Sequence, residues 1–134
     1  MKYSLDTDTC IEYLNNPDSH VGRHLRRHLP LEIVVCSVVR AELWYGVLRS
    51  RNPREAGATV RAFLAPLQSM PFDDEASVIY GEIRSQLAQT GTPIGPNDLL
   101  IAAIAKVRKL TLVTHNTREF SRVRGLALED WRSA

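Results

Sequence analysis

A nearly uniform apolar run at residues 99–105 is the feature that most constrains how this chain folds. Leu, Ile and Ala fill every position of the run, so a helix there has no polar face and must be buried on most sides. Asp98 stands directly before it. An ionisable group at the entrance of a buried helix is costly without a partner, and metal ions or other carboxylates are natural partners. We therefore take residues 91–120 as the segment around which the chain is organised.

The chain of 134 residues is long enough to bury a core, and we expect one domain over residues 1–134. Its first residues lack the pattern of a signal peptide, and no stretch reaches the roughly 20 apolar residues of a membrane span. Cys10 and Cys36 give no indication of an oxidising compartment. These features predict a soluble, cytoplasmic protein that does not associate with a membrane.

The net charge is only +2, but basic residues are concentrated between positions 20 and 61, where eight arginines face three glutamates. The planar guanidinium group of Arg is well suited to bind phosphate oxygens. The cluster is compatible with a nucleic-acid backbone or an acidic protein as the partner. Each single Arg is also explained by a solvated helix face.

Apolar segments that favour strands alternate with segments of helical spacing. We expect strands at 2–6, 32–36 and 110–114, with extended pieces at 70–72 and 126–128; helices at 8–16, 18–28, 37–51, 53–67 and 75–89; a helix that begins near Asp98; and a short helix after Asn116. The strands are apolar runs without strict alternation, which is typical of a parallel sheet covered by helices on both faces. The sequence therefore predicts the α/β class.

Local signals give the starts and the inward faces of these helices. Thr7 or Asp8 is the expected cap of helix 8–16, and Asp73 or Asp74 that of helix 75–89. The residues of helix 75–89 that we expect to point inward are Val78, Ile79, Ile83 and Leu87.

Acidic residues fall where such a sheet collects its ligands, beyond the carboxyl ends of the strands. Asp6 ends the first strand, and the polar loop 114–119 follows a later one. Glu42 and Asp98 sit beside apolar helical residues, where burial of a charge is unusual. Mg²⁺ takes oxygen ligands and commonly one or two carboxylates. Each acid also has an ordinary structural explanation as a helix cap or a surface residue.

The sequence resembles the PIN-domain ribonucleases of the VapC type, the toxins of toxin–antitoxin pairs. The resemblance spans nearly the whole chain and is carried by the segments LDT (5–7), CI (10–11), AEL (41–43), YG (45–46), YGEIR (80–84), GTPIGPNDLLIAA (91–103), LVT (112–114) and NTREF (116–120), with Ser37 and Trp131. It implies a three-layer α/β/α fold around a mostly parallel sheet.

The resemblance also implies a function. A Mg²⁺ or Mn²⁺ site would be built from Asp6, Glu42 and Asp98, and a cation-activated water would hydrolyse RNA and leave 5′-phosphate and 3′-hydroxyl ends. Family members with this loop cut tRNA, in particular initiator tRNA, and are inhibited by a cognate VapB-type antitoxin. In such proteins an antitoxin helix occupies a groove, and the resemblance implies that residues 8–64 would form that groove here. A homodimer, or a hetero-oligomer with the antitoxin, is the implied assembly.

The loop after residue 114 departs from the family pattern, because Asn116 stands where many members carry a fourth acid. Glu119 is the candidate replacement, so Asn116 and Glu119 join the proposed catalytic set. Residues expected to orient ligands or phosphate are Thr7, Thr114 and Arg118, together with Asn116. Asp8 replaces a common Asn and adds a negative charge beside the site.

Two other functions stay open from the residues alone. The segment DTDT (6–9) after an apolar strand is similar to the nucleophile motif of haloacid-dehalogenase-type phosphatases, although no lysine is suitably placed. A PIN-like module that binds RNA or a partner without cutting it is the second alternative, because of Asn116. His20, His24 and His28 share a helix face, for which we prefer a solvated basic surface over a zinc site.

Overall fold

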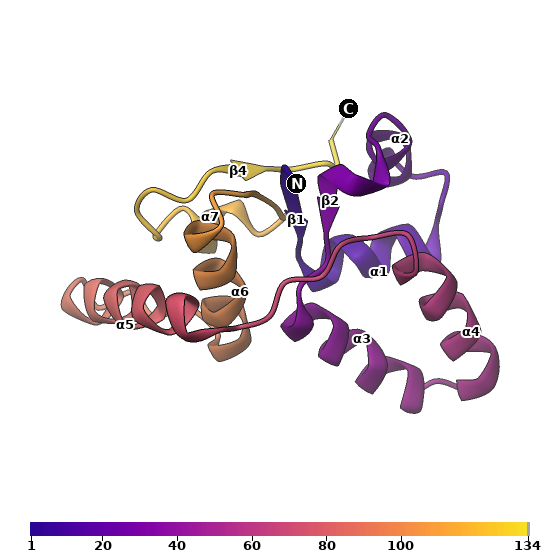
Figure 1. The fold of residues 1–134 in the computed structure, drawn as a ribbon, viewed down its shortest axis with the longest axis horizontal. Coiled ribbons are helices and arrows are strands. Elements are labelled where there is room, and N and C mark those ends of the chain that lie inside the picture. The colour runs from indigo at the N-terminus through magenta and orange to yellow at the C-terminus, as the bar shows by residue number, and fades with distance from the viewer. Residues whose placement is uncertain (134) are drawn as a thin grey trace.

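The computed structural model, which describes residues 1–133, is built on one sheet of short parallel strands (Figure 1). The strands are β1 (Tyr3–Leu5), β2 (Ile33–Val34), β3 (Thr111–Val113) and β4 (Leu128–Glu129). Their order across the sheet is β2-β1-β3-β4, and every pairing is parallel. In this register Leu5 lies beside Val113, so the residues that follow β1 and β3 meet at the same edge.

Helices connect the strands and cover the sheet. They are α1 (Thr7–Asn15), α2 (His20–Arg26), the 3₁₀ turn η1 (Pro30–Glu32), α3 (Ser37–Leu48), α4 (Pro53–Leu64), α5 (Asp74–Gln89), α6 (Pro96–Val107) and α7 (Thr117–Phe120). The crossover from β1 to β2 and the crossover from β2 to β3 run in opposite directions across the sheet. Right-handed crossovers of opposite direction place helices on both faces. The predicted α/β/α architecture is confirmed.

Helix α6 is the central helix of the core, as its apolar sequence predicts. Leu99 and every residue from 101 to 105 are buried, and α6 packs against both α5 and β3. A tight turn connects the helix directly to β3, so the helix and the strand run in opposite directions. The amino end of α6 therefore lies near the carboxyl edge of the sheet. The fold therefore carries Asp98 to the edge where Asp6 and Thr114 lie.

Several expectations for the helices are wrong in detail. Helix α1 is capped by Asp6, as the ordinary structural explanation of this acid predicted, and not by Thr7 or Asp8: the Asp6 carboxylate accepts a hydrogen bond from the backbone N–H of Thr9. Helices α3 and α4 end at Leu48 and Leu64, about three residues earlier than expected.

Within residues 1–133, no helix has the length and apolarity that a membrane crossing needs.

The inward face of α5 also differs from the prediction. Ile83 and Leu87 are buried as expected, but Val78 is 62% exposed and Ala76 takes an inward position instead. Ala76, Ile83 and Leu87 follow one another at seven and four residues, which is one helical stripe. Val78 lies two residues from Ala76 and so projects from the opposite side of the helix.

The surface formed by His20 and His24 of α2 and by His28, which follows the helix, is only partly solvated. His20 is exposed, whereas the rings of His24 and His28 stack on Trp131, each with its centroid 5.3 Å from the indole centroid. Tyr3 of β1 packs against the edge of the same indole. The face therefore holds the carboxyl-terminal segment to the sheet, and the preference for a fully solvated surface is wrong for these two residues.

Candidate active site

Asp6 occupies the carboxyl edge of the sheet directly after β1. Its backbone N–H donates to the carbonyl of Val113 at 3.0 Å, and its carboxylate caps α1 through the Thr9 N–H at 2.9 Å. Only 5% of Asp6 is exposed. Burial raises the pKa of this carboxyl above 3.8, although hydrogen bonds from Thr114 and Thr9 oppose the shift. The helix cap and the candidate ligand are thus the same residue.

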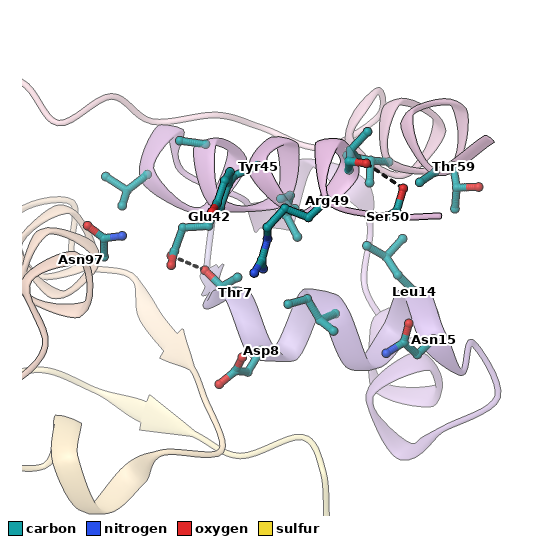
Figure 2. A pocket seen from close by; sticks show the side chains of 18 of the residues that line it. Thr7, Asp8, Leu14, Asn15, Glu42, Tyr45, Arg49, Ser50, Thr59 and Asn97 are labelled. Carbon is teal, nitrogen blue, oxygen red and sulfur yellow. Dashed lines mark hydrogen bonds between the residues drawn. The ribbon is translucent and has the colours of Figure 1, made fainter. Parts of the chain in front are cut away.

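Glu42 comes to this edge from the second turn of α3. Its carboxylate accepts a hydrogen bond of 2.5 Å from the Thr7 hydroxyl, which projects from the first turn of α1 (Figure 2). The sequence predicted that Thr7 orients a substrate or ligand. In the structure it holds Glu42, an acid 35 residues away in the sequence.

Asp98 is the third residue of α6 and lies at the end of this helix that emerges from the core. Burial raises its pKa from 3.8 to about 6, and the carboxylates of Glu119, Asp6, Glu42 and Asp8, in that order, add to the shift. The amino end of a helix favours a negative charge, yet burial and like charges outweigh that effect here. Four acids from three separate segments therefore act on one carboxyl group.

Glu119 is the acid with the largest electrostatic effect on Asp98. One carboxylate oxygen accepts the Gly95 N–H at 2.9 Å, and the other accepts a hydrogen bond from the Asn116 side chain. Gly95 precedes α6, and a Cβ atom at that position would stand 3.4 Å from the Asp98 carboxylate. Glu119 thus joins the loop before α6 to the loop after β3. Sequence reasoning missed Gly95, whose backbone donor leaves no sequence signal.

Asp6, Glu42, Asp98 and Glu119 form the acidic cluster of the site, and the other predicted residues lie around it. Thr114 is buried, and its hydroxyl accepts the Asn116 N–H at 2.9 Å. Arg118 is exposed on α7, one residue before Glu119. Asp8 is exposed on α1 and adds to the raised pKa of both Asp6 and Asp98, in keeping with an extra negative charge beside the site.

The cluster has the donor chemistry of a site for a hard cation. Carboxylates that crowd and repel one another are relieved when a cation neutralises them. Within residues 1–133, no three acidic, histidine or cysteine side chains stand close enough to enclose a metal ion as they lie. Mg²⁺ requires only one or two carboxylates and keeps several waters. The residues present therefore suit Mg²⁺ or Mn²⁺ better than a metal that needs a closed protein cage.

A cleft of about 1200 Å³ opens beside the cluster. Figure 2 shows its walls, with Thr7 and Asp8 on α1, Glu42 on α3 and Asn97 at the start of α6. The cleft continues along α1, α3 and α4, whose walls are largely apolar. The acidic cluster therefore lies at one end of an open channel that a long substrate or partner can enter.

The chain is similar to known proteins over nearly its whole length. The model of the PIN domain family matches residues 3–126. The tRNA(fMet)-specific endonuclease VapC of Salmonella typhimurium is 37% identical over 131 residues, which cover 98% of each chain. Ribonuclease VapC2 of Rickettsia felis is 39% identical over 132 residues, again 98% of each chain.

Solved structures show the same relationship. A chain in the crystal structure of DNA-bound VapBC from Salmonella typhimurium superimposes with a TM-score of 0.93 at 37% identity, over 98% of both chains. A chain in VapBC2 from Rickettsia felis, bound to a DNA fragment from its promoter, gives a TM-score of 0.89 at 36% identity. The chain belongs to the PIN domain family and, within it, to the VapC ribonucleases.

Proposed function

We propose that this chain is a metal-dependent endoribonuclease, the toxin of a toxin–antitoxin pair, and that it cuts tRNA. The observation that carries the proposal is the state of Asp98. A carboxyl group at the mouth of a buried helix has a pKa of about 6 because burial and four other acids act on it. Such an arrangement is costly for folding and is typical of a functional site.

Mg²⁺, or Mn²⁺ in its place, is the cofactor that the donor set favours. Asp6 and Asp98 are the proposed direct ligands, and Glu42 binds directly or through a water. Bound there, the cation supplies charge that offsets the phosphoryl oxygens and acidifies a water for in-line attack. We propose these roles from the chemistry of the carboxylates.

The chain's own residues prepare the site in three ways. Thr7 fixes the Glu42 carboxylate by its hydrogen bond. Glu119 holds Gly95 and Asn116 together, so that the loops before α6 and after β3 keep a fixed separation. Asp98 must give up its proton to act as a ligand, so at limiting Mg²⁺ activity should rise with pH through about 6.

The substrate and the partner follow from the relatives. VapC of Salmonella typhimurium is named as specific for tRNA(fMet), so initiator tRNA is the substrate that we propose first. The solved relatives are VapBC assemblies, and we propose that a VapB-type antitoxin inserts an amphipathic helix into the cleft. The assembly is a homodimer or a hetero-oligomer with the antitoxin, and it acts in the cytoplasm. The family match favours this function over the phosphatase alternative.

Incubation of the purified protein with total tRNA, with and without Mg²⁺, tests the proposal. We expect cuts at few positions, in the presence of the cation only, with 5′-phosphate and 3′-hydroxyl ends. Asp98→Asn should abolish the cuts, whereas Glu82→Gln, a change in an exposed acid on α5, should leave them unchanged. Tight tRNA binding without any cut, under every cation tested, would instead identify a binding module.

A further inference from the structure

The cleft carries a feature on α3 that the acidic cluster does not explain. Glu42, Tyr45 and Arg49 are spaced at three and four residues, so their side chains share one face of the helix. All three line the cleft (Figure 2). With a helix rise of about 1.5 Å per residue, Tyr45 lies about 5 Å and Arg49 about 10 Å beyond Glu42 along the axis. The stripe thus leads from the acidic cluster into the open channel.

Tyr45 and Arg49 are also in contact with each other. The Arg49 guanidinium carbon lies 4.6 Å from the centre of the Tyr45 ring. Tyr45 is 62% exposed, so its ring contributes little to the core. An exposed aromatic ring with a guanidinium stacked on it presents a flat, positively charged surface. That surface is displayed to whatever enters the cleft.

The Tyr45–Arg49 pair favours RNA as the occupant of this end of the cleft, although the lining as a whole is acidic. Among the cleft-lining side chains of residues 1–133, Arg49 is the only lysine or arginine, whereas Asp8, Glu42 and Glu55 are acidic. A polyanion that enters the cleft therefore finds the one basic side chain of the lining at Arg49. Bases stack on aromatic rings and on guanidinium planes, and Arg binds phosphate oxygens. A partner helix would find its apolar contacts farther along the channel, at residues such as Leu14 and Val60.

We infer that Tyr45 and Arg49 form a nucleotide subsite for the RNA substrate. An unpaired base next to the cleavage position stacks on the Tyr45–Arg49 pair, and Arg49 binds the adjoining phosphate. The inference rests on the proposed ribonuclease function and adds the residues that position the strand. It also requires that the bound nucleotide of the RNA be unpaired, because a base that remains paired in a duplex cannot reach the Tyr45 ring.

The test compares cleavage and binding in matched variants. Tyr45→Ala should lower kcat/KM for tRNA cleavage by about ten-fold or more, mainly through KM, because stacking on an aromatic ring is lost. Tyr45→Phe keeps the ring and should stay within about two-fold of the parent. Arg49→Gln should weaken binding and reduce the dependence of affinity on salt by about one phosphate contact. Binding is measured by fluorescence anisotropy of a short labelled single-stranded RNA in an Asp98→Asn background, with the matching duplex as a second probe.

Two control variants remove similar groups outside the cleft lining. Leu48→Ala truncates a side chain that is 75% exposed on the same helix, and Arg54→Gln removes an exposed positive charge on α4. Both should bind and cleave as the parent does. Weaker binding of the single strand, but not of the duplex, by the Tyr45→Ala variant would support the subsite.

The subsite is overturned if Tyr45→Ala and Arg49→Gln cut and bind RNA as the parent does. Loss of antitoxin inhibition alone in these variants would likewise overturn it, because it would assign the surface to the protein partner. A parent protein that neither cuts nor binds RNA would instead refute the proposed function itself. The two failures are distinguished by the activity of the parent.

Discussion

Replacing Asp98 by Asn should make the metal-free protein more stable near neutral pH. The change keeps the shape of the side chain and removes one of the charges that crowd the carboxyl edge of the sheet. Neutralising Asp98 also relieves Asp6, Glu42 and Glu119, which repel it. Replacement of a residue that is kept for catalysis at a cost in stability makes the protein more stable, whereas replacement of a residue that stabilises the fold makes it less stable.

The magnitude follows from the pKa of Asp98. The rise from 3.8 to about 6 corresponds to about 3 kcal/mol at 1.36 kcal/mol per pKa unit. Asp98 keeps part of its surface in water, and solvent screening reduces the gain to about 1–2 kcal/mol. Because the folded chain holds this proton more tightly than the unfolded chain, the penalty is absent below pH 3.8 and complete above about pH 6.

Urea unfolding followed by tryptophan fluorescence measures this difference, since Trp131 is almost fully buried in the folded chain. The experiment is run with a chelator at several pH values between about 4 and 8. Asp74→Asn is the matched control, because Asp74 is an exposed acid in the first turn of α5. For Asp74→Asn we expect the free energy of unfolding to fall by about 0.3–1 kcal/mol, because the helix dipole favours the negative charge that this variant removes. An Asp98→Asn variant less stable than the parent at neutral pH would refute the reasoning.

Three further predictions concern Glu119, Trp131 and Gly91. Glu119→Gln should lower the pKa of Asp98 from about 6 toward 3.8, as followed by NMR titration of the carboxyl carbon; an unchanged pKa would contradict the assignment of Glu119 as its main charged neighbour. Trp131→Ala should cost about 3–5 kcal/mol of unfolding free energy in urea, because the indole is buried between Tyr3 and the two histidines; a cost below about 1 kcal/mol would show that this packing is dispensable. Gly91→Ala should lower thermal stability by about 1–2 kcal/mol because φ is +64° there, whereas Gly81→Ala on α5 should be neutral or stabilising.

Much of the fold could be predicted because apolar segments and helix caps are local signals. The run before Lys106 specified a buried helix, and the apolar strands specified a parallel sheet. The inward face of α5 was harder to predict, since Val78 is more apolar than Ala76 and yet the packing of the helix turns Ala76 inward. The stacking of Trp131 on His24 and His28 joins residues about a hundred positions apart, and no local pattern predicts it.

The candidate site shows the same division. The positions of Asp6 and Asp98 at one edge follow from the topology of a parallel sheet, and the structure brings both there. The sequence did not decide whether Asn116 or Glu119 completes the cation site, because that depends on side-chain geometry. In the structure Asn116 donates to Glu119, and Glu119 is the acid that acts most strongly on Asp98. Their catalytic roles stay predictions.

The most direct test of the central claim is the rate of tRNA cleavage as Mg²⁺ is titrated into metal-free protein. If Asp6, Glu42 and Asp98 hold the cation that drives cleavage, the parent and the Glu82→Gln control should rise from no activity to a plateau. Asp98→Asn should stay inactive throughout the titration. Cleavage by the chelated parent at its full rate, or by Asp98→Asn at the rate of the parent, would contradict the account.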